Sequence, residues 1–328
     1  VNNCVASGPL LSFIRVTYSS KICFLDNPVS TAGVFAANGI QVYLFEALRP
    51  TPELSFAIRQ LGCKAGVVCT ASHNPKEYNG YKAYWEDGAQ VVAPHDTNII
   101  KEVQKITSFN QVNWNKQDDL IHYIEEGFDA IYLEKVKELS LAKEAIQAQK
   151  SMPIVFSPIH GASGKMVPAA LKAFGFENIQ VVKEQAEPDG NFPTVIYPNP
   201  EEPEALTLAV ALGKKSGAAL VLACDPDGDR YAAVVPNEAG EYELLNGNQT
   251  GTLLVYYLLS RKKELGLLTG KDFMVNTIVT TELINKIAAG FGIPCYNVLT
   301  GFKNIASIIL QKEGKETFIA GGEESFGF

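Results

Sequence analysis

Residues 218–230 read Ala-Ala-Leu-Val-Leu-Ala-Cys-Asp-Pro-Asp-Gly-Asp-Arg, a continuous apolar run followed by a polar loop. A short apolar run that ends in a Gly- or Pro-bearing loop is typical of a strand buried on both faces. The same pattern recurs at 65–69, 153–156 and 317–320. Stretches of helical character separate these runs, at 52–61, 164–174, 203–216, 248–265, 281–291 and 302–313. The alternation predicts α/β layers with mixed, mainly parallel sheets.

The 328-residue length favours two or three compact units over a single core. The charged, loosely periodic stretch 118–149 predicts a helix and linker that close a first domain, and Asn237-Glu238-Ala239-Gly240 predicts a hairpin turn. We therefore expect domains over residues 1–145, 146–245 and 246–328. Within residues 1–31 the only candidate element is a strand over Lys21–Leu25.

Composition narrows the class of protein. A 46% hydrophobic and 20% charged chain suits a globular protein, and the net charge of −8 argues against nucleic acid as a partner. The sequence contains no run of eighteen apolar residues, so no membrane-spanning helix is predicted. The first residues do not have the pattern of a signal peptide. The six cysteines have no metal-binding spacing and are expected to be reduced. These features predict a cytoplasmic protein with neither a nucleic-acid nor a membrane partner.

The loop after the 218–223 run carries three carboxylates at alternate positions, Asp225, Asp227 and Asp229. Side chains so placed can converge on one cation, and hard oxygen ligands suit Mg²⁺ or Ca²⁺. Arg230, which follows directly, could clamp phosphate oxygens in a forked geometry. The alternative is a solvated acidic turn, but the position of the loop directly after an apolar strand favours a metal site. An EF-hand is disfavoured because the later Glu is missing.

Other loops carry candidate groups whose chemistry the residues alone leave open. Ser72 follows the 65–69 run and is a candidate nucleophile or phosphate carrier, with His73 beside it. The next candidates are Glu323, Glu324 and Ser325, which could form hydrogen bonds with sugar hydroxyls. Alternatively, the two acidic residues stabilise a helix N-terminus. Lys303, after Thr300 and Gly301, could serve as an acid, a base or a phosphate ligand, or it could simply be solvated. Each of these loops, and the loop that contains His160, could also be purely structural.

Taken in order, Thr70–Pro75, Asp225–Arg230 and Gly322–Gly327 resemble the motifs of the α-D-phosphohexomutase superfamily. Residues 77–85 and 300–303 resemble its phosphoglucomutase/phosphomannomutase branch, which includes phosphopentomutase-type enzymes. The resemblance runs from about residue 36 to residue 328. It implies repeated three-layer α/β domains around a central cleft, of which the third is truncated here and a fourth, phosphate-binding domain is absent.

The resemblance also implies an activity: conversion of glucose 1-phosphate to glucose 6-phosphate through a phosphoserine and a bisphosphorylated sugar. A hexose or pentose phosphate is then the substrate, one Mg²⁺ the cofactor and a sugar bisphosphate the activator, in a monomer or homodimer. The implied residues are catalytic Ser72, His73 and Lys303; substrate-binding Arg230, Thr300, Glu323 and Ser325; and metal-binding Ser72, Asp225, Asp227 and Asp229.

The sequence departs from the family pattern near its start. Ser7-Gly8-Pro9 does not reproduce the family's G-T-x-G-x-R-G segment, and Asp26-Asn27 lacks the Arg of a Y-D-x-R motif, so the first domain is expected to be incomplete. A phosphopentomutase and a noncatalytic sugar-phosphate-binding fragment therefore remain alternatives. A haloacid-type phosphatase is a further one, although Asp229 stands where that class has Thr or Val.

Overall fold

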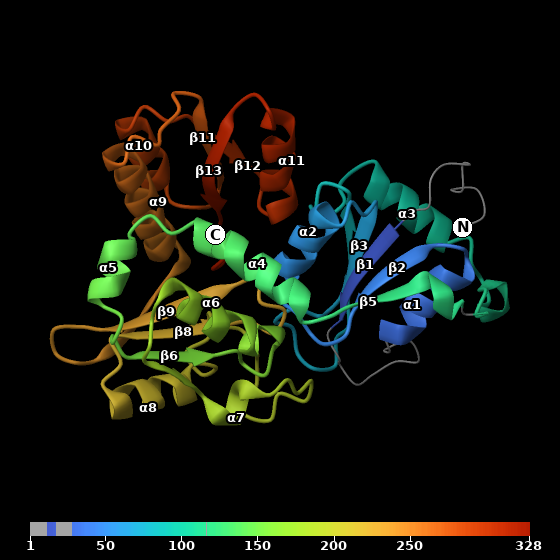
Figure 1. Ribbon diagram of the computed structural model, residues 1–328, viewed down its shortest axis with the longest axis horizontal. Coiled ribbons are helices and arrows are strands. Elements are labelled where there is room, and N and C mark those ends of the chain that lie inside the picture. Colours follow the sequence, from blue (N-terminus) through green and yellow to red (C-terminus); the bar gives the residue numbers. More distant parts are fainter. Residues whose placement is uncertain (1–11, 18–27, 116) are drawn as a thin grey trace. The chain divides into compact units, whose positions relative to one another are not determined.

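The computed structural model describes residues 12–17, 28–115 and 117–328 (Figure 1). The chain separates into two compact units, unit 1 over residues 1–132 and unit 2 over residues 133–328. In the described residues, unit 1 contains one sheet and unit 2 contains two. The predicted Lys21–Leu25 strand lies outside the described residues.

Over its described residues, the sheet of unit 1 has five strands in the order β4-β3-β1-β2-β5. The pairs β1–β2, β1–β3 and β2–β5 are parallel, and β3–β4 is antiparallel. Val42 and Leu44 pack against α1, whereas Phe45 packs against α2, so helices cover both faces. The elements are β1 Ser12–Thr17, α1 Pro28–Ala37, β2 Gln41–Phe45, α2 Thr51–Gln60, β3 Ala65–Cys69, β4 Tyr81–Trp85, α3 His95–Val103, η1 Phe109–Gln111, η2 Asp118–Leu120, β5 Ile121–Ile124 and α4 Gly127–Glu138, which continues into unit 2.

The prediction of one helix over 118–149 was wrong. The segment contains the strand β5, then α4, and finally α5 (Lys143–Ala148). Ile121-His122-Tyr123-Ile124 is rich in β-branched and aromatic side chains, and it pairs with β2 along its whole length. The strand β1, which lies at the centre of the sheet, was also not predicted.

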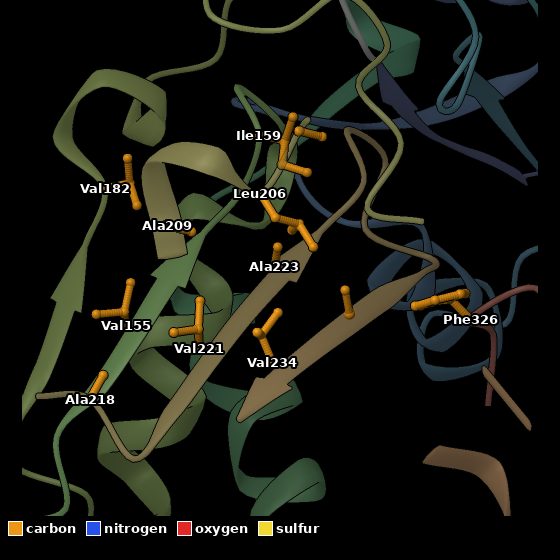
Figure 2. Packing of buried hydrophobic residues seen from close by; sticks show 12 residues of the cluster. Val155, Ile159, Val182, Leu206, Ala209, Ala218, Val221, Ala223, Val234 and Phe326 are labelled. Carbon is orange, nitrogen blue, oxygen red and sulfur yellow. The ribbon is translucent and has the colours of Figure 1, made fainter. Parts of the chain in front are cut away.

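The first sheet of unit 2 has the order β10-β9-β8-β6-β7, with β6–β7 and β6–β8 parallel and the two β9 pairings antiparallel. Its core includes Val155, Val221 and Val234 on three neighbouring strands, packed against Ala209 of α8 (Figure 2). The elements are β6 Ile154–Ser157, η3 Ala162–Gly164, α6 Met166–Phe174, β7 Ile179–Val181, α7 Lys183–Ala186, α8 Thr207–Ser216, β8 Leu220–Cys224, β9 Tyr231–Pro236 and β10 Tyr242–Leu245. The hairpin turn predicted at Asn237–Gly240 joins β9 to β10 and is confirmed.

The second sheet of unit 2 is fully parallel, with the order β12-β11-β13. Met274 faces α9 and α10, whereas Phe273 and Val275 pack against Ile305 of α11 on the opposite face. Figure 1 shows α9 and α10 on one side of the strands and α11 on the other. The elements are α9 Gly247–Glu264, β11 Asp272–Thr277, α10 Glu282–Gly290, β12 Cys295–Val298, α11 Phe302–Lys312 and β13 Thr317–Gly322.

These three sheets with their helices confirm the predicted fold class, and the six helices predicted outside 118–149 all form. The burial of the strands is less uniform than expected, because β8 alternates between buried and half-buried residues and β13 begins exposed. The domain limits at 145 and 245 and the arrangement around a cleft stay predictions. Within the described residues, we find no helix with both the length and the apolar character that crossing a bilayer requires.

Candidate functional site

The acidic loop 225–230 joins β8 to the antiparallel β9. Gly228 adopts a left-handed φ of 69°, and its N–H donates to the Asp225 carbonyl at 3.0 Å, which closes a tight turn. The backbone N–H groups of Asp229 and Arg230 donate to Asp225 Oδ1 at 3.1 and 3.0 Å. In this turn, Asp225, Asp227 and Asp229 each offer an oxygen, and the three oxygens lie within 4.8 Å of one another.

The electrostatics of this loop fit a divalent cation. Asp225 is 0% and Asp227 2% exposed. Burial raises the pKa of Asp225 well above its usual value, and the neighbouring Asp227 and Asp229 carboxylates raise it further. An oxygen-only donor set with this concentration of negative charge suits Mg²⁺. Burial also raises the pKa of the adjacent Cys224 to about 12, so this thiol stays protonated and is a poor metal ligand.

The loop after β6 packs against the acidic loop through its backbone. Because β6 and β8 are parallel neighbours, the two loops leave the sheet at the same edge. Ala162 N donates to the Pro226 carbonyl at 2.8 Å, and the two backbones touch at Gly161. His160 is buried, and its ring is held by the Thr194 hydroxyl at 2.8 Å from Nε2. Its geometry favours a supporting role over substrate contact.

Arg230 is held by a carboxylate that the sequence analysis did not identify. Its Nη1 donates to Glu201 Oε1 at 2.7 Å, and both side chains are partly exposed. No spacing rule connects position 201 to position 230, and the local sequence Asn199-Pro200-Glu201 carries no metal or phosphate pattern. The predicted role of Arg230 as a phosphate ligand therefore stays a prediction.

Ser72 lies in the loop between β3 and the antiparallel β4, in unit 1. It is half-buried with a left-handed φ of 54°, a backbone conformation that is uncommon for a residue with a side chain. Thr70 Oγ1 accepts from Ser72 N at 2.7 Å. Ser72 Oγ lies 3.2 Å from His73 Nδ1, so the structure brings these two candidates within hydrogen-bond distance. A constrained loop thus presents the hydroxyl.

The loop after β13 carries the predicted sugar-binding residues in unit 2. Glu323 Oε2 accepts from Gly301 N at 3.0 Å, which ties this loop to the one that contains Thr300. Both loops leave the same edge because β12 and β13 are each parallel to β11. Thr300 is exposed and Ser325 half-buried. Lys303 is exposed, and its side chain forms no hydrogen bond or ion pair with any residue that the structure describes.

The acidic loop and the Glu323 loop lie within electrostatic reach of each other. Burial raises the pKa of Glu323, the Gly301 N–H lowers it, and Glu324 and Asp229 raise it while Arg230 lowers it. The loops are also joined through the backbone, since Tyr231 N donates to the Phe326 carbonyl at 3.0 Å. Unit 2 therefore brings the three aspartates, Arg230, Thr300, Glu323 and Ser325 together on connected loops. Ser72 belongs to unit 1, so its joint ligation of the metal stays a prediction.

Two threonines at this edge were also missed. Thr277 is the last residue of β11 and Thr280 follows in the next loop, where its hydroxyl donates to Glu324 Oε2 at 2.9 Å. The sequence contained a signal for these threonines, because polar residues at the end of an apolar strand in an α/β protein lie at the edge where ligands bind. The paired carboxylates Glu323 and Glu324 have different partners, which the sequence did not distinguish.

Comparison with known proteins identifies the family. Models described as "Phosphoglucomutase/phosphomannomutase, alpha/beta/alpha" match for domain I at residues 29–110, domain II at 130–240 and domain III at 246–328. A human phosphopentomutase is 36% identical over 307 residues, which is 90% of this chain and 50% of that protein. A phosphoglucomutase from Staphylococcus epidermidis is 35% identical over 301 residues, 90% of this chain and 54% of that protein.

A solved structure agrees in fold. The crystal structure of a putative phosphomannomutase from Thermus thermophilus superposes with a TM-score of 0.73 at 25% identity, covering 97% of this chain and 66% of that one. The chain spans about half the length of the curated relatives described above. The three successive domain matches and these similarities show that the chain belongs to the α-D-phosphohexomutase superfamily.

Proposed function

We propose that the protein is an isomerase of the phosphoglucomutase/phosphomannomutase type, which moves a phosphoryl group between two hydroxyls of a hexose phosphate. Glucose 1-phosphate is the first substrate to test. The observation that carries the proposal is the convergence of Asp225, Asp227 and Asp229 within 4.8 Å, in a chain of this family. Cytoplasmic location, activation by a sugar bisphosphate and a monomeric or homodimeric state belong to the same proposal.

Ser72 would carry the phosphoryl group. Its hydroxyl gives up a proton when the phosphoryl group arrives, and His73 Nδ1 at 3.2 Å is a group positioned to take that proton. Transfer to the sugar leaves a bisphosphorylated intermediate, which returns its other phosphoryl group to Ser72. Such a reaction mainly requires positioning and neutralisation of phosphate charge, which Arg230 and Lys303 would supply.

The three aspartates would hold one Mg²⁺. When bound, the ion would neutralise phosphoryl oxygens and so favour charge redistribution during transfer. Asp225 would be the best-fixed ligand, because two backbone N–H groups already orient its Oδ1. Glu323, Ser325 and Thr300 would contact the sugar, with one oxygen of Glu323 left for hydroxyls while the other accepts from Gly301 N.

A pentose phosphate is the second candidate substrate. The similarity to human phosphopentomutase covers 90% of the chain, as large a share as the similarity to the bacterial phosphoglucomutase covers. Turnover of ribose 1-phosphate and glucose 1-phosphate should therefore be compared directly, with mannose 1-phosphate as a third substrate.

The phosphate carrier gives the sharpest test of the function. Intact-mass spectrometry after incubation with glucose 1,6-bisphosphate should show one added phosphate, localised to Ser72. Ser72→Ala should lose both that phosphate and mutase turnover by several orders of magnitude, because no group at this position can then accept the phosphoryl. Ser108→Ala, which changes an exposed serine of the same unit, should retain both. A Ser72→Ala protein that still turns over sugar phosphate would overturn the mechanism, and a parent that never takes up phosphate would favour a noncatalytic binding role.

A further inference from the structure

Glu324 lies between the two proposed sugar-binding residues, but its own side chain turns toward the loop after β11. Glu324 Oε2 accepts from Thr280 Oγ1 at 2.9 Å, and the backbone N–H of Glu324 donates to Thr280 Oγ1 at 3.1 Å. Thr280 Oγ1 in turn lies 2.7 Å from Thr277 Oγ1. Thr277 Oγ1 also lies 3.4 Å from Glu324 Oε2, as a second and longer hydroxyl donor to the same carboxylate. The buried Thr280 hydroxyl thus contacts both the side chain and the backbone of Glu324, whereas Thr277 reaches the side chain only.

The surroundings of this contact restrict the loop on both sides. Thr277 and Thr280 are 1% and 6% exposed, so water does not substitute readily for either hydroxyl. A Cβ at Gly247 would overlap the Glu324 carbonyl oxygen, which shows how closely the start of α9 approaches the loop. Phe326, two residues after Glu324, is buried against the core of the β10-β9-β8-β6-β7 sheet (Figure 2).

We propose that Thr280 and Glu324 are positioning residues for sugar recognition. Glu323 and Ser325 are the immediate neighbours of Glu324, so a displacement of the Glu324 backbone moves both of them. The Thr280 contact fixes that backbone, while Phe326 fixes the far end of the loop. This inference rests on the proposed function, since it assigns the purpose of the contact to sugar binding at Glu323 and Ser325.

The test compares Thr280→Val with Thr280→Ser in the full chain. Valine has the shape of threonine without its hydroxyl, so Glu324 loses one donor and one acceptor in a buried position. Serine keeps the hydroxyl and is the matched control. Calorimetric titration with glucose 6-phosphate should show affinity about 10- to 100-fold weaker for Thr280→Val, the range expected when a buried hydrogen bond to a charged group is lost. Thr280→Ser should stay within a few-fold of the parent.

Further readouts separate positioning from general damage. Mg²⁺ affinity and the maximum rate of Ser72 phosphorylation at saturating glucose 1,6-bisphosphate should stay near the parent values in Thr280→Val, so that the loss appears in KM and not in kcat. Hydrogen exchange of residues 321–327 should accelerate in Thr280→Val alone. A cycle with Glu324→Leu should be strongly non-additive, because either change breaks the same contact.

Equal sugar affinity and equal hydrogen exchange in Thr280→Val and the parent would overturn the inference. A parallel loss of Mg²⁺ affinity and sugar affinity would also overturn it, since that pattern indicates a general structural defect. Failure of the proposed function looks different: the parent itself would bind no sugar phosphate, whereas hydrogen exchange would still report whether Thr280 holds the loop.

Discussion

His160 is a histidine whose environment in the fold disfavours its charged form. It is buried at the edge of the sheet from which the acidic loop leaves, and its φ of 57° lies in the left-handed region. Burial lowers its pKa from 6.5, against smaller raising effects from the Glu187 carbonyl and the Asp189 carboxylate. The neutral ring is therefore the form that the folded protein prefers.

This preference predicts a pH-dependent stability. Between the lowered pKa of folded His160 and the unfolded value of 6.5, the unfolded chain binds more protons, so stability falls as pH decreases through that window. His160→Asn removes the titration, and Asn tolerates a left-handed φ. Urea denaturation of the parent at about pH 7.5 and about pH 5.5 should show a larger loss of unfolding free energy than in His160→Asn. His95→Asn, at an exposed histidine, is the control, and equal losses in parent and His160→Asn would contradict the prediction.

Among elements, the loops after β6 and β8 approach each other closely through their backbones at the acidic loop. A Cβ on Gly161 would lie 2.5 Å from both the Cα and the carbonyl oxygen of Pro226, and 2.8 Å from the Pro158 carbonyl oxygen. These are backbone atoms, which cannot rotate away as a flexible side chain can. The position of the acidic loop therefore depends on the absence of a side chain at residue 161.

Gly161→Ala should displace that loop. We expect it to lower the unfolding free energy by about 1–3 kcal/mol through overpacking and to weaken Mg²⁺ binding by about tenfold or more. Gly290→Ala is the matched control, because a Cβ there meets no atom within 4 Å and should change stability by at most about 1 kcal/mol, in the favourable direction. Calorimetric Mg²⁺ titration and urea denaturation check both variants, and unchanged Mg²⁺ affinity in Gly161→Ala would show that the contact does not position the ligands.

The elements also show what a sequence can and cannot predict. The β8 strand and its acidic loop were predictable because a continuous apolar run and three spaced carboxylates are local signals. The strand β5 was not, because its four residues are embedded in a charged stretch and its stability depends on pairing with β2, about eighty residues earlier in the chain. The buried ion pair of Arg49 with Asp129, at 2.7 Å, has no local signal either, since it depends on the packed fold.

At the scale of the whole molecule, the acidic site imposes a balance between stability and metal binding. The chain has a net charge of −8, and three of its carboxylates are gathered within 4.8 Å. Without a cation, burial and mutual repulsion disfavour the charged form, as the raised pKa of Asp225 indicates. The metal-free protein should therefore be less stable than one from which a carboxylate has been removed, and Mg²⁺ should reverse that order.

Asp227→Asn tests this reversal. The amide keeps the shape of the side chain, removes one charge and can donate to Asp225, whose pKa is raised partly by contact with Asp227. In EDTA, Asp227→Asn should melt a few degrees above the parent, since about 1 kcal/mol shifts Tm by roughly 2–4 °C in a domain of this size. At Mg²⁺ about 100-fold above Kd the parent should gain about 2.7 kcal/mol, or roughly 5–10 °C, and overtake the variant. NaCl at equal ionic strength controls for screening and should produce no such crossing. If Mg²⁺ stabilises parent and Asp227→Asn equally, the three carboxylates do not act together on one ion.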